Sequence, residues 1–158
     1  MERSGLSDRF LIDSCGTGGG NGDWYRAGGW SYHQGDASDP RMTAAAAKRG
    51  IALTSKSRPL TPPDLAAFDL VVGMDAKNIA AIRLAADHWR AGPQGQGIVP
   101  PDYTARLSLM TDYCTKFKAA YVPDPYYGGS EGFETVLDLL EDASQGLLSR
   151  LRAERGLP

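Results

Sequence analysis

The chain has 158 residues, the size of one domain, which we expect to span residues 1–158. Its 17 basic and 19 acidic residues give a net charge of −2, which excludes the basic footprint of a nucleic-acid-binding domain. No apolar run approaches the ~20 residues that cross a bilayer, so no membrane partner is expected. With 2 cysteines and a polar first ten residues, we expect a cytoplasmic protein with reduced thiols and no secretory signal.

The N-terminal third predicts one strand, one long loop and one helix. Phe10–Cys15 is a short apolar run closed by glycines, which predicts a buried strand. Residues 16–38 are rich in glycine and aromatic residues and predict a long surface loop. Asp39 and Pro40 are typical of a helix start, and Gly50 of a helix end, so a helix is expected between them.

The central part predicts two further strands and two helices. Thr61 followed by proline indicates a short helix. Phe68–Met74 has the continuous apolar character of a strand buried on both faces. Asp75 is expected to cap a helix that runs to about His88, and Ala105–Met110 is a third strand candidate.

The last segment predicts a long amphipathic helix. Its apolar residues follow helical spacing, whereas acidic residues, Asp142 among them, fill the other faces. The apolar residues are Phe133, Val136, Leu137, Leu140, Ala143, Leu147, Leu148 and Leu151. Strands alternating with helices predict an α/β fold with a parallel sheet flanked by helices.

Most familiar catalytic motifs are absent from the sequence. The glycines of residues 16–22 do not fit a dinucleotide-binding or nucleoside-triphosphate loop, so we expect a flexible insertion and no cofactor. Neither Cys15 nor Cys114 has an arginine six residues later, which excludes both as a phosphate-loop nucleophile. His33 and His88 stand far apart and away from cysteines, so no metal site is assigned.

The most informative segment lies just before the last helix. Asp124 stands between two prolines, which hold it in a stiff loop, and Tyr126 and Tyr127 follow it. A rigid carboxyl group beside aromatic side chains suits proton transfer to an aromatic leaving group. A plain turn whose aromatics pack on the helix remains the alternative.

Taken together, several motifs resemble the low-molecular-weight protein-tyrosine phosphatase family in its bacterial form. They are, in chain order, Gly5–Phe10, Ile12–Thr17, Tyr32–Gly35, Asp39–Met42, Phe68–Asp69, Met74–Asn78, Asp124–Gly128 and Phe133–Glu134. The resemblance implies a flavodoxin-like fold and a substrate that is a phosphotyrosine protein or a small aryl phosphate. It further implies that Asp124 is the general acid and base, and that Tyr126, Tyr127, Trp30 and Tyr32 wall the substrate cleft.

The resemblance also implies that part of the family pattern is lacking. Family members begin with a strand, a Cys-x₅-Arg phosphate loop and a helix, whereas the match here starts at the end of that helix. We therefore expect a natural start upstream of Met1, with roughly one strand–loop–helix unit lacking, and no activity from this chain alone. In the strand order 2-1-3-4 the lacking strand separates Phe10–Cys15 from Phe68–Met74 by ~9.6 Å. The sheet must then close up, recruit another strand or fail to fold stably.

Other functions remain open at this point. One alternative is a non-catalytic module that binds phosphotyrosine-type ligands through the retained aromatics. An arsenate reductase would need more resolving cysteines than the 2 present. Phosphoarginine specificity would be set in the lacking loop, so the sequence does not decide it, and a weak homodimer is left open.

Overall fold

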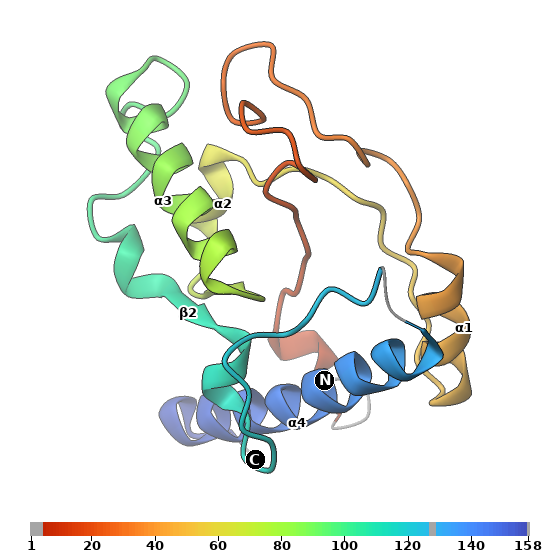
Figure 1. Ribbon diagram of the computed structural model, residues 1–158. Coiled ribbons are helices and arrows are strands. Elements are labelled where there is room, and N and C mark those ends of the chain that lie inside the picture. Colours follow the sequence, from red (N-terminus) through yellow and green to blue (C-terminus); the bar gives the residue numbers. More distant parts are fainter. Residues whose placement is uncertain (1–4, 127–128, 158) are drawn as a thin grey trace.

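The computed structural model describes residues 5–126 and 129–157. The helices are α1 (Pro40–Lys48), α2 (Pro62–Ala67), α3 (Ala76–Ala91) and α4 (Ser130–Arg155); the strands are β1 (Val71–Gly73) and β2 (Leu107–Leu109). Three 3₁₀ turns, η2 (Ser7–Arg9), η3 (Tyr103–Arg106) and η4 (Met110–Tyr113), complete the regular elements of the described part. Figure 1 shows their arrangement.

The predicted helices are confirmed; α1, α2 and α3 begin at the expected caps, whereas α4 begins after Gly129 without a side-chain cap. The Asp39 carboxylate accepts a hydrogen bond from the Arg41 amide at 2.8 Å, and the Asp75 carboxylate from the Asn78 amide at 2.7 Å. Before α2, the Thr61 amide donates to the Asp64 carboxylate at 2.7 Å, which makes a capping box. These helix starts depend on residues within one turn, which is why local sequence identifies them.

The sheet has two parallel strands with a helix on each face. Val71 pairs with Leu107 and Gly73 with Leu109. Val71 packs into an apolar core built on α3, whereas its neighbour Val72 packs into a core built on α4. Because successive side chains of a strand point to opposite faces, two adjacent valines are enough to anchor both helices.

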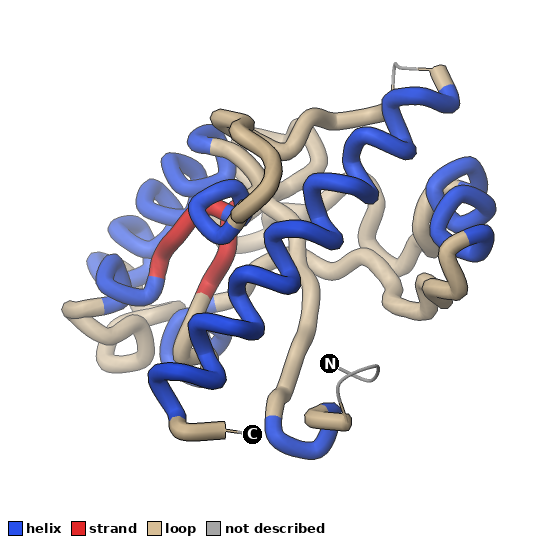
Figure 2. The backbone as a smooth tube through the Cα atoms, turned by 90° about the horizontal axis from the view of Figure 1, so that it is seen from below, coloured by secondary structure: helices blue, strands red, loops and turns tan. Residues whose placement is uncertain are grey.

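The predicted strand Phe10–Cys15 does not join the sheet, and the expectation that it is buried is wrong. The segment is extended, but in the described residues its only ladder contact is at its end, where Gly16 bridges Pro59. Leu11 is 82% exposed and Ile12 65% exposed. Figure 2 shows the segment as an isolated extended tube beside the two strands. It lacks a neighbour, since the described chain neither closes the sheet onto it nor supplies another strand.

The glycine- and aromatic-rich loop is anchored in the core rather than lying wholly on the surface. Trp24 and Tyr25 are buried in the α3 core, and the Trp89 indole N–H donates to the Tyr25 carbonyl at 2.8 Å. Gly18 has a φ of +93°, and a Cβ there would overlap the Trp24 ring. A glycine at this position therefore allows the tight turn that brings Trp24 inward.

The apolar face of α4 is largely confirmed. Phe133, Val136, Leu137, Ala143 and Leu148 are buried. Despite its length, α4 is too charged to cross a bilayer, and no other helix of the described residues meets the requirements of a membrane span.

Asp142 departs from the prediction of a solvated acidic face, since it is only 4% exposed. Its carboxylate accepts hydrogen bonds from the amides of Thr115, Lys116 and Phe117 at 2.9–3.0 Å and from the Thr115 hydroxyl at 2.8 Å. Burial opposes the charged form, but the hydrogen bonds prevail and hold the pKa of Asp142 well below its usual range. The charged carboxylate thus fastens the segment after η4 to α4.

We expect Asp142→Asn to lower the melting temperature at pH 7 by about 5 °C or more, because the amide offers an N–H to donors and carries no charge. Thermal unfolding followed by circular dichroism measures the change. Asp87→Asn, at an exposed position on α3, is the matched control and should change little.

The same pair of variants tests the pH dependence. A lowered pKa means that the contribution of Asp142 is full above the unfolded pKa near ~4 and is lost as the pH falls further. The difference between wild type and Asp142→Asn should therefore be largest at neutral pH and shrink in acid. A difference that grew below pH 4 would contradict this assignment.

Candidate active site

The carboxyl end of β1 holds three segments together. The Met74 carbonyl, directly after β1, accepts a hydrogen bond from the Val122 amide at 2.9 Å. The Met74 amide donates to the Asn78 side-chain oxygen at 3.1 Å, and the Asn78 side-chain nitrogen donates to the Thr17 hydroxyl at 3.3 Å. The start of α3, the glycine-rich loop and the chain leading to Asp124 therefore meet at this point, where ligands of open α/β sheets usually bind.

Asp124 lies two residues beyond this junction and is exposed. Its Oδ1 accepts a hydrogen bond from the Tyr126 amide at 2.9 Å, so the carboxylate closes its own turn. The flanking prolines restrict the backbone on both sides. The structure thus presents a carboxyl group on a restricted, solvent-facing corner, from which it can reach a ligand that binds beside it.

Arg41 fastens this corner to α1, and sequence reasoning did not single it out. Its guanidinium donates to the Tyr126 carbonyl at 3.2 Å and lies 5.3 Å from the centre of the Tyr126 ring. It also lies 5.0 Å from the Phe133 ring. The side-chain hydrogen bond and charge of Arg41 lower the pKa of Asp39 to about 2, so the Asp39 carboxylate that holds Arg41 stays charged. The contact joins residues 85 positions apart, and only tertiary structure reveals it.

The aromatic residues that were predicted to line the substrate cleft fall into two groups. Trp30 and Tyr32, 53% and 59% exposed, stack edge to face with their ring centres 4.3 Å apart. The Trp30 carbonyl is held by the Asn21 side chain at 2.6 Å. Within the described residues no hydrogen bond or ring contact links this pair to Asp124, whereas Tyr126 lies directly beside Asp124. Tyr127 lies outside the described residues.

Neither cysteine is activated as a nucleophile. Desolvation raises the pKa of the Cys15 thiol, with Asp64 and Asp13 adding to it and Arg58 opposing. Desolvation and then Asp142 raise the pKa of the Cys114 thiol, which points at the Leu139 carbonyl at 3.8 Å. Because the thiolate is the reactive form, both environments disfavour attack on phosphorus.

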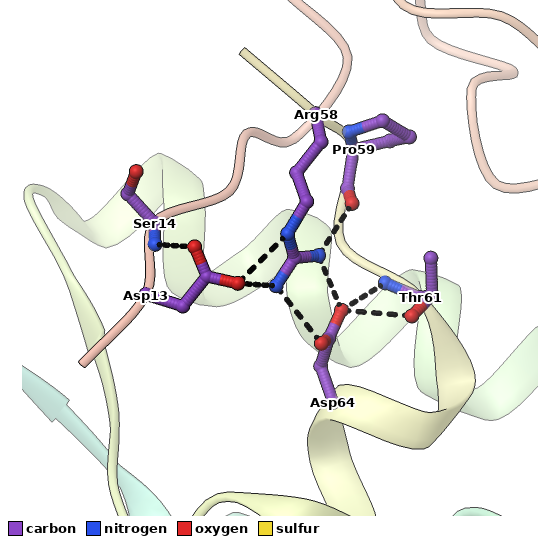
Figure 3. A network of polar contacts seen from close by, with 6 residues as sticks. All are labelled: Asp13, Ser14, Arg58, Pro59, Thr61 and Asp64. Atoms are coloured by element: carbon purple, nitrogen blue, oxygen red, sulfur yellow. Dashed lines mark hydrogen bonds and ion pairs between the residues drawn. The ribbon is translucent and has the colours of Figure 1, made fainter. Parts of the chain in front are cut away.

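Arg58 interacts electrostatically with Cys15, but two carboxylates already bind its guanidinium. Figure 3 shows its guanidinium between Asp13 and Asp64, with hydrogen bonds of 2.9–3.1 Å to both. It also donates to the Pro59 carbonyl at 3.1 Å. A guanidinium fork that binds two carboxylates does not present a free face to a phosphate. Through these ion pairs, Arg58 links the extended segment Phe10–Cys15 to α2.

The chain is similar to known proteins of one family. A family model for low molecular weight phosphotyrosine protein phosphatases matches residues 1–157. A Synechocystis protein whose name places it among the low molecular weight protein-tyrosine-phosphatases is 40% identical over 154 residues, covering 98% of this chain and 83% of that one. The low molecular weight phosphotyrosine protein phosphatase of Schizosaccharomyces pombe is 34% identical, with 96% and 81% covered.

The fold matches as well. A crystal structure of a protein tyrosine phosphatase from Entamoeba histolytica superimposes with a TM-score of 0.76 at 32% identity, covering 98% of this chain and 82% of that one. The α/β fold with a parallel sheet flanked by helices, expected from the resemblance, is thereby confirmed. With a family model spanning 157 of its 158 residues, this chain belongs to the low molecular weight protein-tyrosine phosphatases, a family of phosphoric monoester hydrolases.

Proposed function

We propose that this chain carries the proton-transfer half of a site that hydrolyses aryl phosphomonoesters such as phosphotyrosine. The observation that carries the proposal is Asp124, an exposed carboxyl group on a stiff corner beside the end of β1. Tyr126 next to it offers an exposed ring against which an aryl group can pack. Family membership supports the substrate class.

Asp124 would act twice in such a reaction. When a cysteine thiolate attacks phosphorus, the bond to the aryl oxygen breaks, and protonated Asp124 donates its proton to the departing phenolate oxygen. The resulting carboxylate then removes a proton from water as that water attacks phosphorus and the thiolate leaves. Solvent exposure of Asp124 fits this second step, because the water must reach it.

We further propose that the 158-residue chain does not catalyse this reaction alone. Its sequence holds no Cys-x₅-Arg motif, both thiols have raised pKa values, and Arg58 is engaged with Asp13 and Asp64. A nucleophile and a phosphate-binding arginine must therefore come from elsewhere.

The purified chain should hydrolyse p-nitrophenyl phosphate between pH 5 and 7 no faster than buffer does. Release of p-nitrophenolate, followed by absorbance, measures this. A rate above that of a mock purification, abolished by Cys15→Ser or Cys114→Ser, would show that one of these thiols is a nucleophile and would refute the proposed inactivity.

The role of Asp124 is tested by joining this chain to the N-terminal Cys-x₅-Arg segment of a relative. In an active fusion, Asp124→Asn should lower kcat by about 10²–10⁴-fold. The loss should be larger for phenyl phosphate than for p-nitrophenyl phosphate, because the more basic phenolate depends more on protonation. Asp102→Asn, an exposed aspartate before η3, is the control. Equal losses for the two substrates would contradict general-acid catalysis by Asp124.

A binding module is the second candidate, favoured by the exposed pair Trp30 and Tyr32. If this function holds, calorimetry should detect a phosphotyrosine peptide but not its unphosphorylated form, without turnover. Trp30→Ala should weaken that binding by about tenfold, since loss of a stacking surface costs about 1.4 kcal/mol. Absence of binding to the wild-type chain would remove this candidate.

A further inference from the structure

The loop of residues 114–121 leaves the carboxyl edge of the sheet and returns to it. It follows η4, directly after β2, and ends where the Val122 amide donates to the Met74 carbonyl at 2.9 Å. Figures 1 and 2 show it beside α4, across that helix from η2. Because each residue spans at most about 3.6 Å, Lys118 in this loop lies within about 22 Å of Asp124 along the chain.

The backbone of the 114–121 loop is fixed to α4. Three successive amides, those of residues 115–117, donate to the buried Asp142 carboxylate at 2.9–3.0 Å. At the base of the loop, α4 approaches so closely that a Cβ at Gly146 would overlap the Tyr113 carbonyl. A loop whose backbone is already ordered loses little conformational entropy when a partner binds to it.

The positive charges of this loop are not neutralised by neighbouring side chains. Lys116 and Lys118 are exposed, and within residues 5–126 and 129–157 neither ammonium group forms an ion pair. The sequence holds no acidic residue from 113 to 123, although the chain carries 19. Asp142 is only 4% exposed, so its charge does not face the solvent beside the lysines. The loop is thus a locally basic surface on a chain of net charge −2.

Two aromatic side chains of the same loop are left in water. Phe117 is 44% exposed and Tyr121 55% exposed. In the part of the chain that the structure describes, neither ring packs on another aromatic ring or under an arginine. Aromatic rings on a fixed backbone offer a partner a large contact area at a small loss of entropy. Exposed rings beside unpaired cations are typical of an interaction surface.

We propose that the 114–121 loop docks an acidic segment of a protein substrate. Carboxylates of that segment pair with Lys116 and Lys118, and an apolar side chain between them packs on the exposed rings of the loop. This inference rests on the proposed function, because the segment belongs to the protein whose phosphotyrosine reaches Asp124. An extended peptide spans about 3.3 Å per residue, so the acidic segment stands within about seven residues of the phosphotyrosine.

Two other anionic partners fit the loop less well. Segments that hold proteins on anionic membranes carry about four to eight cations, each contributing about 1 kcal/mol, whereas this loop has two lysines. A nucleic acid requires a wider cluster of lysines and arginines, which a chain of net charge −2 does not offer here. Two cations and two rings within eight residues match a short peptide that is both acidic and apolar.

The test uses a peptide without phosphate, so that docking is measured apart from catalysis. The peptide has a leucine between two pairs of glutamates, and the control peptide has glutamines in place of the glutamates. A titration followed by amide chemical shifts in NMR spectra should show saturable shifts in residues 115–121 with the acidic peptide. The control should bind at least about fivefold more weakly. Salt at about 0.5 M should weaken binding of the acidic peptide, because it screens exposed charges.

A pair of lysine variants places the site. Lys116→Gln combined with Lys118→Gln should weaken binding of the acidic peptide by about fivefold or more. Lys48→Gln, at the exposed end of α1, should leave it unchanged. All three lysines are exposed, so the melting temperatures should stay the same and show that each variant is folded.

Three results would overturn the proposal. They are equal affinity of the chain for the two peptides, equal affinity of wild type and the double variant for the acidic peptide, and sedimentation with phosphatidylserine vesicles that the double variant loses. The last result would assign the loop to a membrane surface instead. None of these measurements involves turnover, so a failure of docking and a failure of the chemistry of Asp124 appear in different experiments.

Discussion

The backbone of β1 is the feature on which the rest of the structure depends. One edge pairs with β2, its two valines anchor the cores on α3 and α4, and the carbonyl of Met74 holds the chain that leads to Asp124. Its other edge has no strand beside it in the described residues. A three-residue strand thus connects the two cores and the candidate active site.

Where the sheet does not hold segments together, charged side chains do. Arg58 clasps the extended segment to the start of α2 through Asp13 and Asp64. Arg49, at the end of α1, reaches Glu134, Asp138 and Glu141 on successive turns of α4. Isolated surface ion pairs contribute little, but networks in which one guanidinium serves several carboxylates are better able to fix geometry. These arginines act as structural ties, which is a reason not to regard either as a phosphate ligand.

The candidate active site is likewise held together by side chains, because its residues come from distant positions in the sequence and few contacts join them. Asp124 owes its stiffness to its own prolines and its turn to the Tyr126 amide, whereas Arg41 from α1 holds Tyr126 in place. Trp30 and Tyr32 form a separate exposed pair in the loop that Trp24 anchors. The proposed chemistry therefore assigns proton transfer to this chain and leaves attack on phosphorus to groups outside it.

Local sequence was sufficient for the helices and for the stiff corner at Asp124, because capping carboxylates, prolines and apolar spacing act within one or two turns. The family motifs were likewise identified from the sequence without the structure. Pairing and burial were decided only by the tertiary structure. Phe10–Cys15 has the composition of a buried strand, yet a strand exists only where a neighbour meets its hydrogen bonds. The sequence predicts an exposed acidic side chain at Asp142, but three amides from a distant segment donate hydrogen bonds to its carboxylate. The link from Arg41 to Tyr126 likewise spans 85 positions, and no local pattern can encode which distant groups will meet.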